Sequence, residues 1–385
     1  MFCKEVDDLQ PKPLRVLHVV GGMDRGGAET MIMNFYRKID RTKIQFDFLC
    51  MKRGEHHYDE EIRSLGGRII HIDPPKSVGI IKHIYDMMRV MRKYGPFIAI
   101  HAHTQFHSGI VAFAAFLAGI RKRICHSHTT SDMSTNNILR RLYFRIMRVL
   151  IRIFATKMLA CSNEAGAFLF GTSSMKSGNV FIFQNAIDLS KYELLSEKNA
   201  IELKHLLNLP IESIILGHVG RFSQPKNHKF LVQLMKYVKA NSLNIFLVLV
   251  GDGELRRDIE NIVKVEELNE YIKFLGIRED IPELMNMFDV FIMPSLYEGL
   301  PVVLVEAQAA GTPCIVSDRI SREVDFGLNL IEFVSLDAPV EEWVDKIVKR
   351  AGTKLKNFSK IREAYKKRKF DVDEVVKEIE KIYMD

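Results

Sequence analysis

Short apolar runs alternate with longer amphipathic segments along most of this chain. The runs that predict buried strands lie at 14–20, 44–50, 69–72, 97–103, 214–220, 246–250 and 290–293. Between them, apolar residues recur every three or four positions, most clearly over 80–94, and this spacing predicts helices. Strands that alternate with helices in this way predict α/β domains, each a parallel sheet with helices on both faces.

The alternation is interrupted by a polar segment at 189–208, which predicts a linker with a short helix. A chain of 385 residues has room for two or three domains. We therefore predict an N-terminal domain over 1–190 and a C-terminal domain over 191–370. A last helix is predicted over 371–385, with Asp373 as its N-cap.

The stretch after the apolar run at 290–293 predicts a strand, a tight loop and a helix. Gly299 permits a sharp turn, and Pro301 stands where a helix begins, because its missing N–H costs nothing there. Free backbone N–H groups at such a helix start attract phosphate. Since Pro301 has no N–H, the donors are expected to be Leu300, Val302 and Val303.

Two carboxylates flank this predicted helix start. Glu298 lies on the loop and Glu306 lies within the helix, with seven residues between them. A phosphate at the helix start would thus have a carboxylate on either side, and each carboxylate can accept hydrogen bonds from hydroxyl groups. The stretch predicts a seat for a sugar nucleotide.

The fourteen residues Pro-Ser-Leu-Tyr-Glu-Gly-Leu-Pro-Val-Val-Leu-Val-Glu-Ala at 294–307 resemble the signature of family 4 retaining glycosyltransferases. The resemblance covers nearly the whole chain and is most specific in its second half. It implies the GT-B fold, in which two doubly wound Rossmann-like domains face each other across a cleft. The N-terminal domain would bind the acceptor, the C-terminal domain would bind the nucleotide sugar, and the last helix would cross back to the N-terminal domain.

The resemblance also implies roles for particular residues. Arg221 and Lys226 match an Arg and a Lys that neutralise the charge of the leaving diphosphate, and His128 matches a histidine that contacts the donor sugar. Ala186 stands where the family usually has Gly. The donor-binding positions are then Gly22, Arg221, Lys226, Ile277, Glu298, Gly299, Leu300, Val302, Val303 and Glu306, and the catalytic positions are His128, Arg221, Lys226 and Glu298.

The loop that contains Gly22 is rich in glycine, which lets backbone approach a ligand closely. It is not Gly-x-Gly-x-x-Gly, so a dinucleotide site is not indicated. The alternative is an ordinary flexible loop between a strand and a helix.

Histidines gather in the middle of the first half, at His101, His103, His107, His126 and His128. Two His-x-His pairs would suit a metal site, but no carboxylate or cysteine nearby completes a ligand set. We expect strand-end histidines that point into a cleft, with no bound metal and no cofactor.

The segment 139–157 is a strongly patterned basic helix. Arg141, Arg145, Arg148 and Arg152 form one stripe beside Arg140, and Leu142, Ile146, Val149 and Ile153 form an apolar face opposite it. Such a helix suits an anionic membrane surface or an anionic acceptor. The alternative is a core-facing helix with a solvated basic side.

The net charge of +7 favours an anionic partner, yet no nucleic-acid-binding motif accompanies it, so we expect no nucleic acid. Five isolated cysteines and an acidic, polar start without the features of a signal peptide predict reduced thiols and a cytoplasmic protein. The longest apolar run, near 110–120, is shorter than the ~20 residues of a spanning helix. The protein is expected to be soluble, or peripheral on the inner face of the membrane.

These observations lead to one predicted function and two alternatives. From the resemblance, we predict retaining transfer of a hexose or N-acetylhexosamine from a nucleotide sugar, expected to be UDP-linked, to a growing lipid-linked saccharide in exopolysaccharide or capsule synthesis. The segment Ser317-Asp318-Arg319-Ile320 resembles that branch of the family. The alternatives are a nucleotide-sugar epimerase or phosphorylase of the same fold, and a non-catalytic subunit that binds saccharide or membrane.

Overall fold

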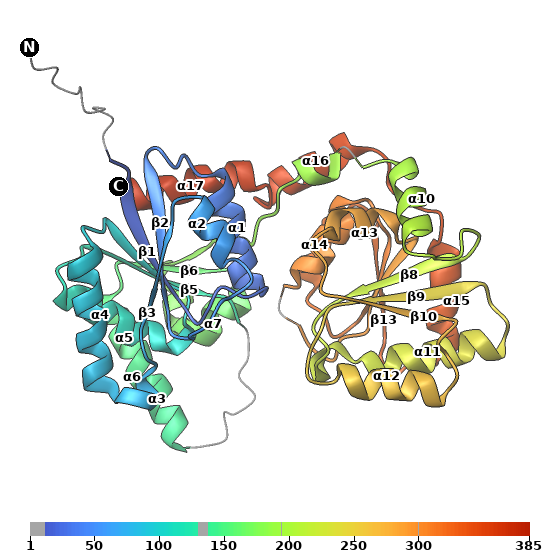
Figure 1. The fold of residues 1–385 in the computed structure, drawn as a ribbon, viewed down its shortest axis with the longest axis horizontal. Helices are drawn as coiled ribbons and strands as arrows, with labels where there is room; N and C mark the ends of the chain where they lie inside the picture. Colours follow the sequence, from blue (N-terminus) through green and yellow to red (C-terminus); the bar gives the residue numbers. More distant parts are fainter. Residues whose placement is uncertain (1–11, 130–137, 194, 299) are drawn as a thin grey trace, which may run out of the picture. The chain divides into compact units, whose positions relative to one another are not determined.

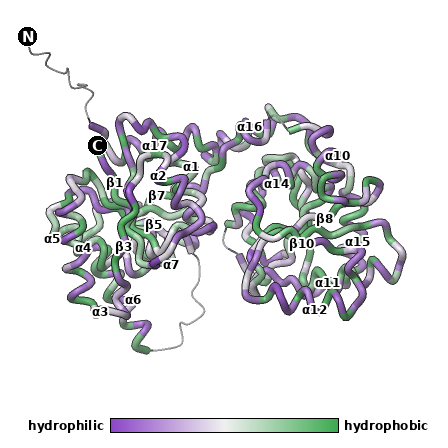
Figure 2. Tube along the Cα trace, viewed as in Figure 1, coloured by the Kyte–Doolittle hydropathy of each residue, from purple (hydrophilic) through white to green (hydrophobic). Residues whose placement is uncertain are grey.

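The computed structural model describes residues 12–129, 138–193, 195–298 and 300–385. They form two compact units (Figure 1). Unit 1 comprises the chain up to Asn185 together with Asp373–Asp385, and unit 2 comprises Ala186–Val372. In both units the strands at the centre are predominantly hydrophobic and the helices around them are mixed (Figure 2).

Unit 1 is built on a sheet of seven parallel strands in the order β3-β2-β1-β4-β5-β6-β7. The strands are β1 (Leu14–Val20), β2 (Ile44–Cys50), β3 (Arg68–His71), β4 (Ala99–Ala102), β5 (Lys122–Ser127), β6 (Lys157–Ala160) and β7 (Val180–Ile182). Its helices are α1 (Gly27–Lys38), α2 (Asp59–Ser64), α3 (Pro75–Val78), α4 (Ile80–Tyr94), α5 (Ser108–Leu117), α6 (Ile138–Phe154), α7 (Asn163–Phe170), α8 (Thr172–Lys176) and α17 (Val372–Met384).

The two faces of this sheet have different cores. On one face, α4 to α7 bury an apolar cluster that includes Met87, Val111 and Phe144. On the other face, α1 and α17 cover aromatic rings, and Phe46 lies 5.0 Å from the ring centroid of Tyr36 and 5.9 Å from that of Tyr383. The second face is the one that carries the histidines.

Unit 2 repeats the plan with six parallel strands in the order β10-β9-β8-β11-β12-β13. The strands are β8 (Ile214–Val219), β9 (Ile245–Val250), β10 (Ile272–Gly276), β11 (Val290–Met293), β12 (Cys314–Ser317) and β13 (Ile331–Val334). Its helices are α9 (Ser190–Glu193), α10 (Glu197–Leu206), α11 (His228–Ala240), α12 (Arg256–Val265), α13 (Ile281–Met287), α14 (Val302–Ala309), α15 (Val340–Arg350) and α16 (Phe358–Lys367).

The strand order reverses direction once in each sheet. In unit 1 the reversal lies between β1 and β4, and in unit 2 it lies between β8 and β11. Loops that leave the carboxyl ends of strands on either side of such a reversal diverge, and open α/β sheets bind their ligands there. The predicted parallel α/β architecture is thus confirmed. Each unit has one reversal of strand order, and the two reversals are the positions where a ligand site is expected.

Most predicted elements are found close to their expected bounds, and two details are wrong. The helix predicted over 139–157 ends at Phe154, and Lys157 already begins β6. Asp373 is not an N-cap, because α17 begins one residue earlier; its carboxylate instead lies 3.2 Å from the Lys38 ammonium group of α1.

Candidate functional site

Unit 2 brings two of the predicted site residues into direct contact at the reversal of its sheet. Lys226 lies in the loop after β8 and Glu298 lies in the loop after β11, and Lys226 Nζ is 2.7 Å from Glu298 Oε1. Both side chains are only 17% exposed. The structure therefore joins an ammonium group and a carboxylate that are far apart in the sequence.

Backbone contacts hold these two loops together. The Leu296 N–H donates to Pro225 O at 2.8 Å, and the Asn227 side-chain amide donates to Pro294 O at 3.1 Å. Asn227 has a φ of 55°, in the left-handed region that Asn tolerates better than most residues. The turn at Asn227 ends the loop and begins α11, which fixes the position of Lys226.

Helix α14 begins beside this pair, as the sequence predicts. Pro301 is its N-cap and the Leu304 N–H donates to Pro301 O at 3.0 Å, so the amides of Val302 and Val303 precede the helical hydrogen-bond ladder. Leu300 comes directly before Pro301, and Gly299 lies outside the described residues. The helix start can therefore present backbone donors to an anion.

Glu306 lies on α14, one turn beyond these amides, and is partly buried. Burial, and then the negative charge of Glu306, raises the pKa of Tyr192 well above its usual value. The Tyr365 hydroxyl donates to Val305 O and fastens the same helix to α16. Glu306 therefore lies on a helix that is anchored to α16.

Arg221 and Ile277 are placed differently from Lys226. The Arg221 guanidinium is exposed and lies 3.2 Å from Glu254, a partner that the sequence analysis did not foresee. An exposed ion pair of this kind is weak, so Arg221 can exchange Glu254 for another anion. Ile277 is exposed directly after β10.

Gly251 shows how closely the loops of unit 2 approach one another. Its φ is 131°, and a Cβ atom there would lie 2.1 Å from Gly220 O. The Gly220 N–H donates to Val250 O, and the Gly251 N–H donates to Gly276 O. The carboxyl ends of β8, β9 and β10 are thus joined by backbone, and a side chain at Gly251 would separate them.

In unit 1, the predicted glycine-rich loop follows β1 at the reversal of the sheet. A Cβ atom on Gly22 would lie 2.8 Å from the His56 ring. His56 in turn lies 3.0 Å from the Asp24 carboxylate through Nδ1. A side chain at Gly22 would therefore displace the His56 ring, whatever ligand the loop binds.

The histidine cluster is real, but its membership differs from the prediction. His18 of β1 pairs in register with His101 of β4, and His18 Nδ1 lies 3.0 Å from His103 Nε2. His107 lies elsewhere, with its Nε2 3.0 Å from that of His83 on α4. His18 is absent from the predicted cluster because its place beside His101 depends on the pairing of β1 with β4, which the sequence alone does not give.

The clustered imidazoles are neutral. Burial lowers the pKa of His18 and of His128 to about 3, and it holds the pKa of His101, His103 and His126 well below the usual value, with neighbouring histidines adding to the effect. Two groups of three have ligand nitrogens within 4.8 Å of one another, His18 with His101 and His103, and His103 with His126 and His128. These are the groups among the described residues that could hold a metal.

The basic helix α6 does not pack through its predicted apolar row, as the core-facing alternative would require. Phe144, Met147 and Ile151 are its buried residues. The four aliphatic residues that were expected to oppose the arginines are 48–63% exposed: Leu142, Ile146, Val149 and Ile153. Because these four lie roughly opposite the buried face on a helix of 3.6 residues per turn, the outermost surface of α6 is aliphatic.

Four arginines of α6 lie along one flank of this aliphatic row: Arg141, Arg145, Arg148 and Arg152. The guanidinium group of Arg148 donates to Phe168 O and Leu169 O, at 2.7 and 3.2 Å. Arg152 Nη2 lies 3.5 Å from Phe170 O. These two side chains bind the carboxyl end of α7, so part of the predicted basic stripe has a structural task.

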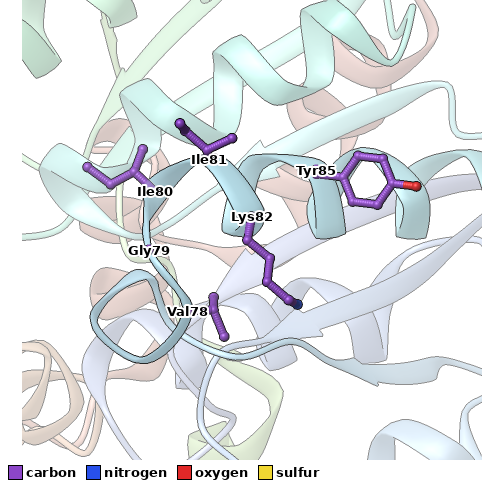
Figure 3. A pocket seen from close by; sticks show the side chains of 6 residues that line it. All are labelled: Val78, Gly79, Ile80, Ile81, Lys82 and Tyr85. Atoms are coloured by element: carbon purple, nitrogen blue, oxygen red, sulfur yellow. The ribbon is translucent and has the colours of Figure 1, made fainter.

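A second exposed apolar surface lies at the start of α4. A pocket there is lined by Val78, Gly79, Ile80, Ile81, Lys82 and Tyr85 (Figure 3). Ile80, Ile81 and Tyr85 are all more than half exposed. Helix α5 contacts both α4 and α6 and exposes Phe116 at its end. Within the described part of the chain, no helix has the length and apolar character that crossing a membrane requires.

Comparison with known proteins adds family assignments to this geometry. The family model described as Glycosyltransferase Family 4 matches residues 25–191, and the one described as Glycosyl transferases group 1 matches residues 201–329. The putative glycosyltransferase EpsF of Bacillus subtilis (strain 168) is 46% identical over 338 residues, 88% of each chain.

Two further proteins are similar at lower identity. The UDP-Gal:alpha-D-GlcNAc-diphosphoundecaprenol alpha-1,3-galactosyltransferase of Escherichia coli is 24% identical over 312 residues, 79% of each chain. The crystal structure of Anabaena Alr3699/HepE with UDP superposes with a TM-score of 0.75 at 19% identity, over 96% of this chain and 99% of that one. The chain belongs to glycosyltransferase family 4 and has the GT-B fold.

Proposed function

We propose that the protein transfers a hexose or N-acetylhexosamine from a UDP-sugar, with retention of configuration, to a growing lipid-linked saccharide in exopolysaccharide or capsule synthesis. The observation that carries this proposal is the contact between Lys226 and Glu298 beside the start of α14. A sugar diphosphate has hydroxyl groups next to anionic oxygens. The paired cation and carboxylate match those two parts of one ligand.

Each predicted residue then has a task on the donor. Lys226 and Arg221 neutralise the charge that grows on the leaving UDP, and the amides at the start of α14 bind its phosphate. Glu298 accepts hydrogen bonds from sugar hydroxyls and stabilises positive charge at the anomeric carbon. Glu306 accepts hydrogen bonds from the ribose hydroxyls, and the backbone near Ile277 contacts the base.

The reaction proceeds as a displacement on one face of the sugar. The bond between the anomeric carbon and the UDP oxygen breaks while the acceptor oxygen bonds to the same carbon from the same side. The acceptor proton passes to the departing β-phosphate oxygen, so no protein nucleophile is used. His128 contacts the donor sugar during this step.

The names of similar proteins support the choice of donor and acceptor. The Escherichia coli relative is named for UDP-Gal and for a diphosphoundecaprenol acceptor, and HepE has been crystallised with UDP-glucose. We extend both features to this chain as part of the proposal.

The experiment that tests the proposal measures nucleotide release from a panel of UDP-sugars. UDP release that appears only when a lipid-linked saccharide acceptor is added is the expected result. An epimerase would alter the sugar without an acceptor, a phosphorylase would require inorganic phosphate, and a binding subunit would release no UDP at all. Any of these three outcomes would rule out the proposed transferase activity.

We also propose that unit 1 attaches to anionic membranes through α6. The aliphatic row of Leu142, Ile146, Val149 and Ile153 faces outward and has basic side chains along its flank. An amphipathic helix of this kind binds in the membrane interface by burying its apolar row, and cations near an anionic surface add roughly 1 kcal/mol each. A lipid-linked acceptor would lie at the same surface.

Sedimentation with anionic liposomes separates the two contributions. Changing Ile146, Val149 and Ile153 to Ser should abolish sedimentation, whereas changing Arg141 and Arg145 to Gln should weaken it mainly at low salt. Arg148 and Arg152 stay unchanged because they bind α7. If the wild type and both variants sediment alike, α6 is only a solvated helix and does not bind membranes.

A further inference from the structure

The loop that follows β1, at the strand-order reversal of unit 1, is bound to the loop that follows β2. The Tyr58 N–H donates to Met23 O at 3.0 Å. One residue further along the first loop, the Asp24 carboxylate lies 3.0 Å from His56 Nδ1. The loop after β1 is therefore held in place by both a main-chain and a side-chain contact.

The contact between Asp24 and His56 has a defined direction. A carboxylate oxygen accepts hydrogen bonds, so the donor is the N–H at His56 Nδ1. The His56 side chain is only 9% exposed and its ring packs on Gly22, whereas the Asp24 side chain is 56% exposed. Lys52 Nζ lies 3.8 Å from the other carboxylate oxygen, and an exposed ion pair of this length is weak. A buried imidazole thus orients a carboxylate that a ligand can reach.

The turn that follows β4, on the other side of the reversal, has an exposed polar side chain in an unusual backbone conformation. Gln105 has a φ of 52°, and within the described part of unit 1 no other residue except glycine has a positive φ. Such conformations are concentrated at ligand sites. The Gln105 side-chain amide donates to the Thr129 hydroxyl at 3.1 Å, and its oxygen is an acceptor. Because β1 and β4 are paired, Asp24 and Gln105 follow neighbouring strands at their carboxyl ends.

The side chains at this edge suit hydroxyl groups better than phosphate groups. A carboxylate repels an anion but accepts hydrogen bonds from hydroxyls, and these are stronger than hydrogen bonds between neutral groups. A side-chain amide both donates and accepts, as a sugar hydroxyl does. The chemistry of the edge therefore matches a saccharide.

We propose that Asp24 binds hydroxyl groups of the acceptor saccharide, that Gln105 is a second hydrogen-bonding group for it, and that His56 is a positioning residue that orients the Asp24 carboxylate. The inference rests on the proposed function for the identity of this ligand. Gly22, two residues before Asp24, is a proposed donor contact. Acceptor and donor would thus both contact the loop after β1.

Binding of free sugars tests the site without turnover. In NMR spectra, N-acetylglucosamine or galactose at millimolar concentration is expected to shift the backbone amide signals of Asp24 and Gln105. Asp24→Asn should weaken this binding about tenfold or more, because hydrogen bonds to a charged group are lost. Glu55→Gln is the matched control, since Glu55 is an exposed carboxylate of the loop after β2 that pairs with Arg63. If neither sugar moves these signals in the wild type, the proposal is overturned.

Steady-state turnover then tests the roles of the two residues. Asp24→Asn should raise the acceptor KM about ten- to hundredfold and leave the affinity for UDP unchanged in calorimetry. His56→Leu removes the donor and should raise the acceptor KM less, whereas His56→Asn can place an amide nitrogen near the position of Nδ1 and should restore it. An unchanged acceptor KM in Asp24→Asn would overturn the binding role. Equal losses in the two His56 variants would overturn the positioning role.

Failure of the proposed function gives a different result. In that case neither the wild type nor any variant turns over a UDP-sugar, while the sugar titration still decides whether Asp24 binds hydroxyl groups.

Discussion

The two units have the same topology but different chemistry at the reversal of their strand order. In unit 2 that point carries a cation and a carboxylate in contact, Lys226 and Glu298, beside the amides of a helix start. In unit 1 it carries neutral imidazoles, with His18 and His101 on neighbouring strands. One fold thus supplies a charged site suited to a diphosphate and an uncharged, hydrogen-bonding site suited to hydroxyl groups.

The largest expected difference between the two units is in their stability toward acid. A histidine in an unfolded chain has a pKa of about 6.5, whereas burial lowers the pKa of His18 and His128 to about 3. Between these values the unfolded state binds more protons, so stability that is complete above pH 6.5 is lost as the pH falls. Each such histidine removes about 1.4 kcal/mol per pH unit.

Unit 1 has five histidines in this cluster, whereas unit 2 has two buried ones, His218 and His228, with lowered pKa values. We therefore expect unit 1 to unfold first on acidification below pH 6.5. Trp343, the single tryptophan, is buried in unit 2 and reports on that unit alone. Far-UV circular dichroism should fall while Trp343 fluorescence stays native; simultaneous loss would contradict the prediction.

Removal of the unit 2 cation should have the largest effect on turnover. Lys226→Ala is expected to lower kcat about 100-fold or more, because a group that stabilises developing phosphate charge is lost. Arg221→Ala should also lower kcat strongly. Steady-state assays measure both, with Lys229→Ala as a control that removes an exposed charge three residues away. Near-normal turnover in both variants would remove this pair from the mechanism.

Loss of Glu306 should weaken nucleotide binding more modestly. Glu306→Ala is expected to reduce the affinity for UDP by about 1–3 kcal/mol, the scale of a lost hydrogen bond to a charged group. Isothermal titration calorimetry measures the change, and Glu306→Gln, which keeps an acceptor, should lie between the wild type and the Ala variant. An unchanged dissociation constant would show that Glu306 does not bind the ribose.

A chelator should have the smallest effect. In the proposed site, Lys226, Arg221 and the start of α14 would supply the positive charge for the diphosphate. The Asp-x-Asp pattern at Asp371 and Asp373, which could otherwise suggest a metal site, lies at the start of α17 and not in a loop at the proposed site. Transferase activity is therefore expected to survive EDTA. Activity that is lost in EDTA and restored by Mg²⁺ or Mn²⁺ would make the histidines of unit 1 candidate ligands.

Local signals were the part of the structure that the sequence predicted well. Helix α4 spans Ile80–Tyr94 as expected from its apolar spacing, and α14 begins after Pro301 as expected from its missing N–H. Both depend on interactions within one turn or one element. A single sequence contains that information directly.

Contacts between elements were not accessible in the same way. The position of His18 beside His101 follows from the order of the strands, and the pairing of Arg221 with Glu254 follows from how two loops meet. In α6, two apolar rows share one helix, and the periodicity did not show that Phe144, Met147 and Ile151 are the buried ones. Which of the two rows is buried depends on the sheet and on the helices that pack against α6.

The last helix of the chain completes the first unit. Tyr383 of α17 reaches His101 through its hydroxyl at 2.7 Å and covers Phe46, and the Asp40 N–H donates to Glu380 at 3.1 Å. During synthesis on the ribosome, domains usually fold as they emerge. Here the aromatic face of unit 1 stays uncovered until every residue of unit 2 has been translated.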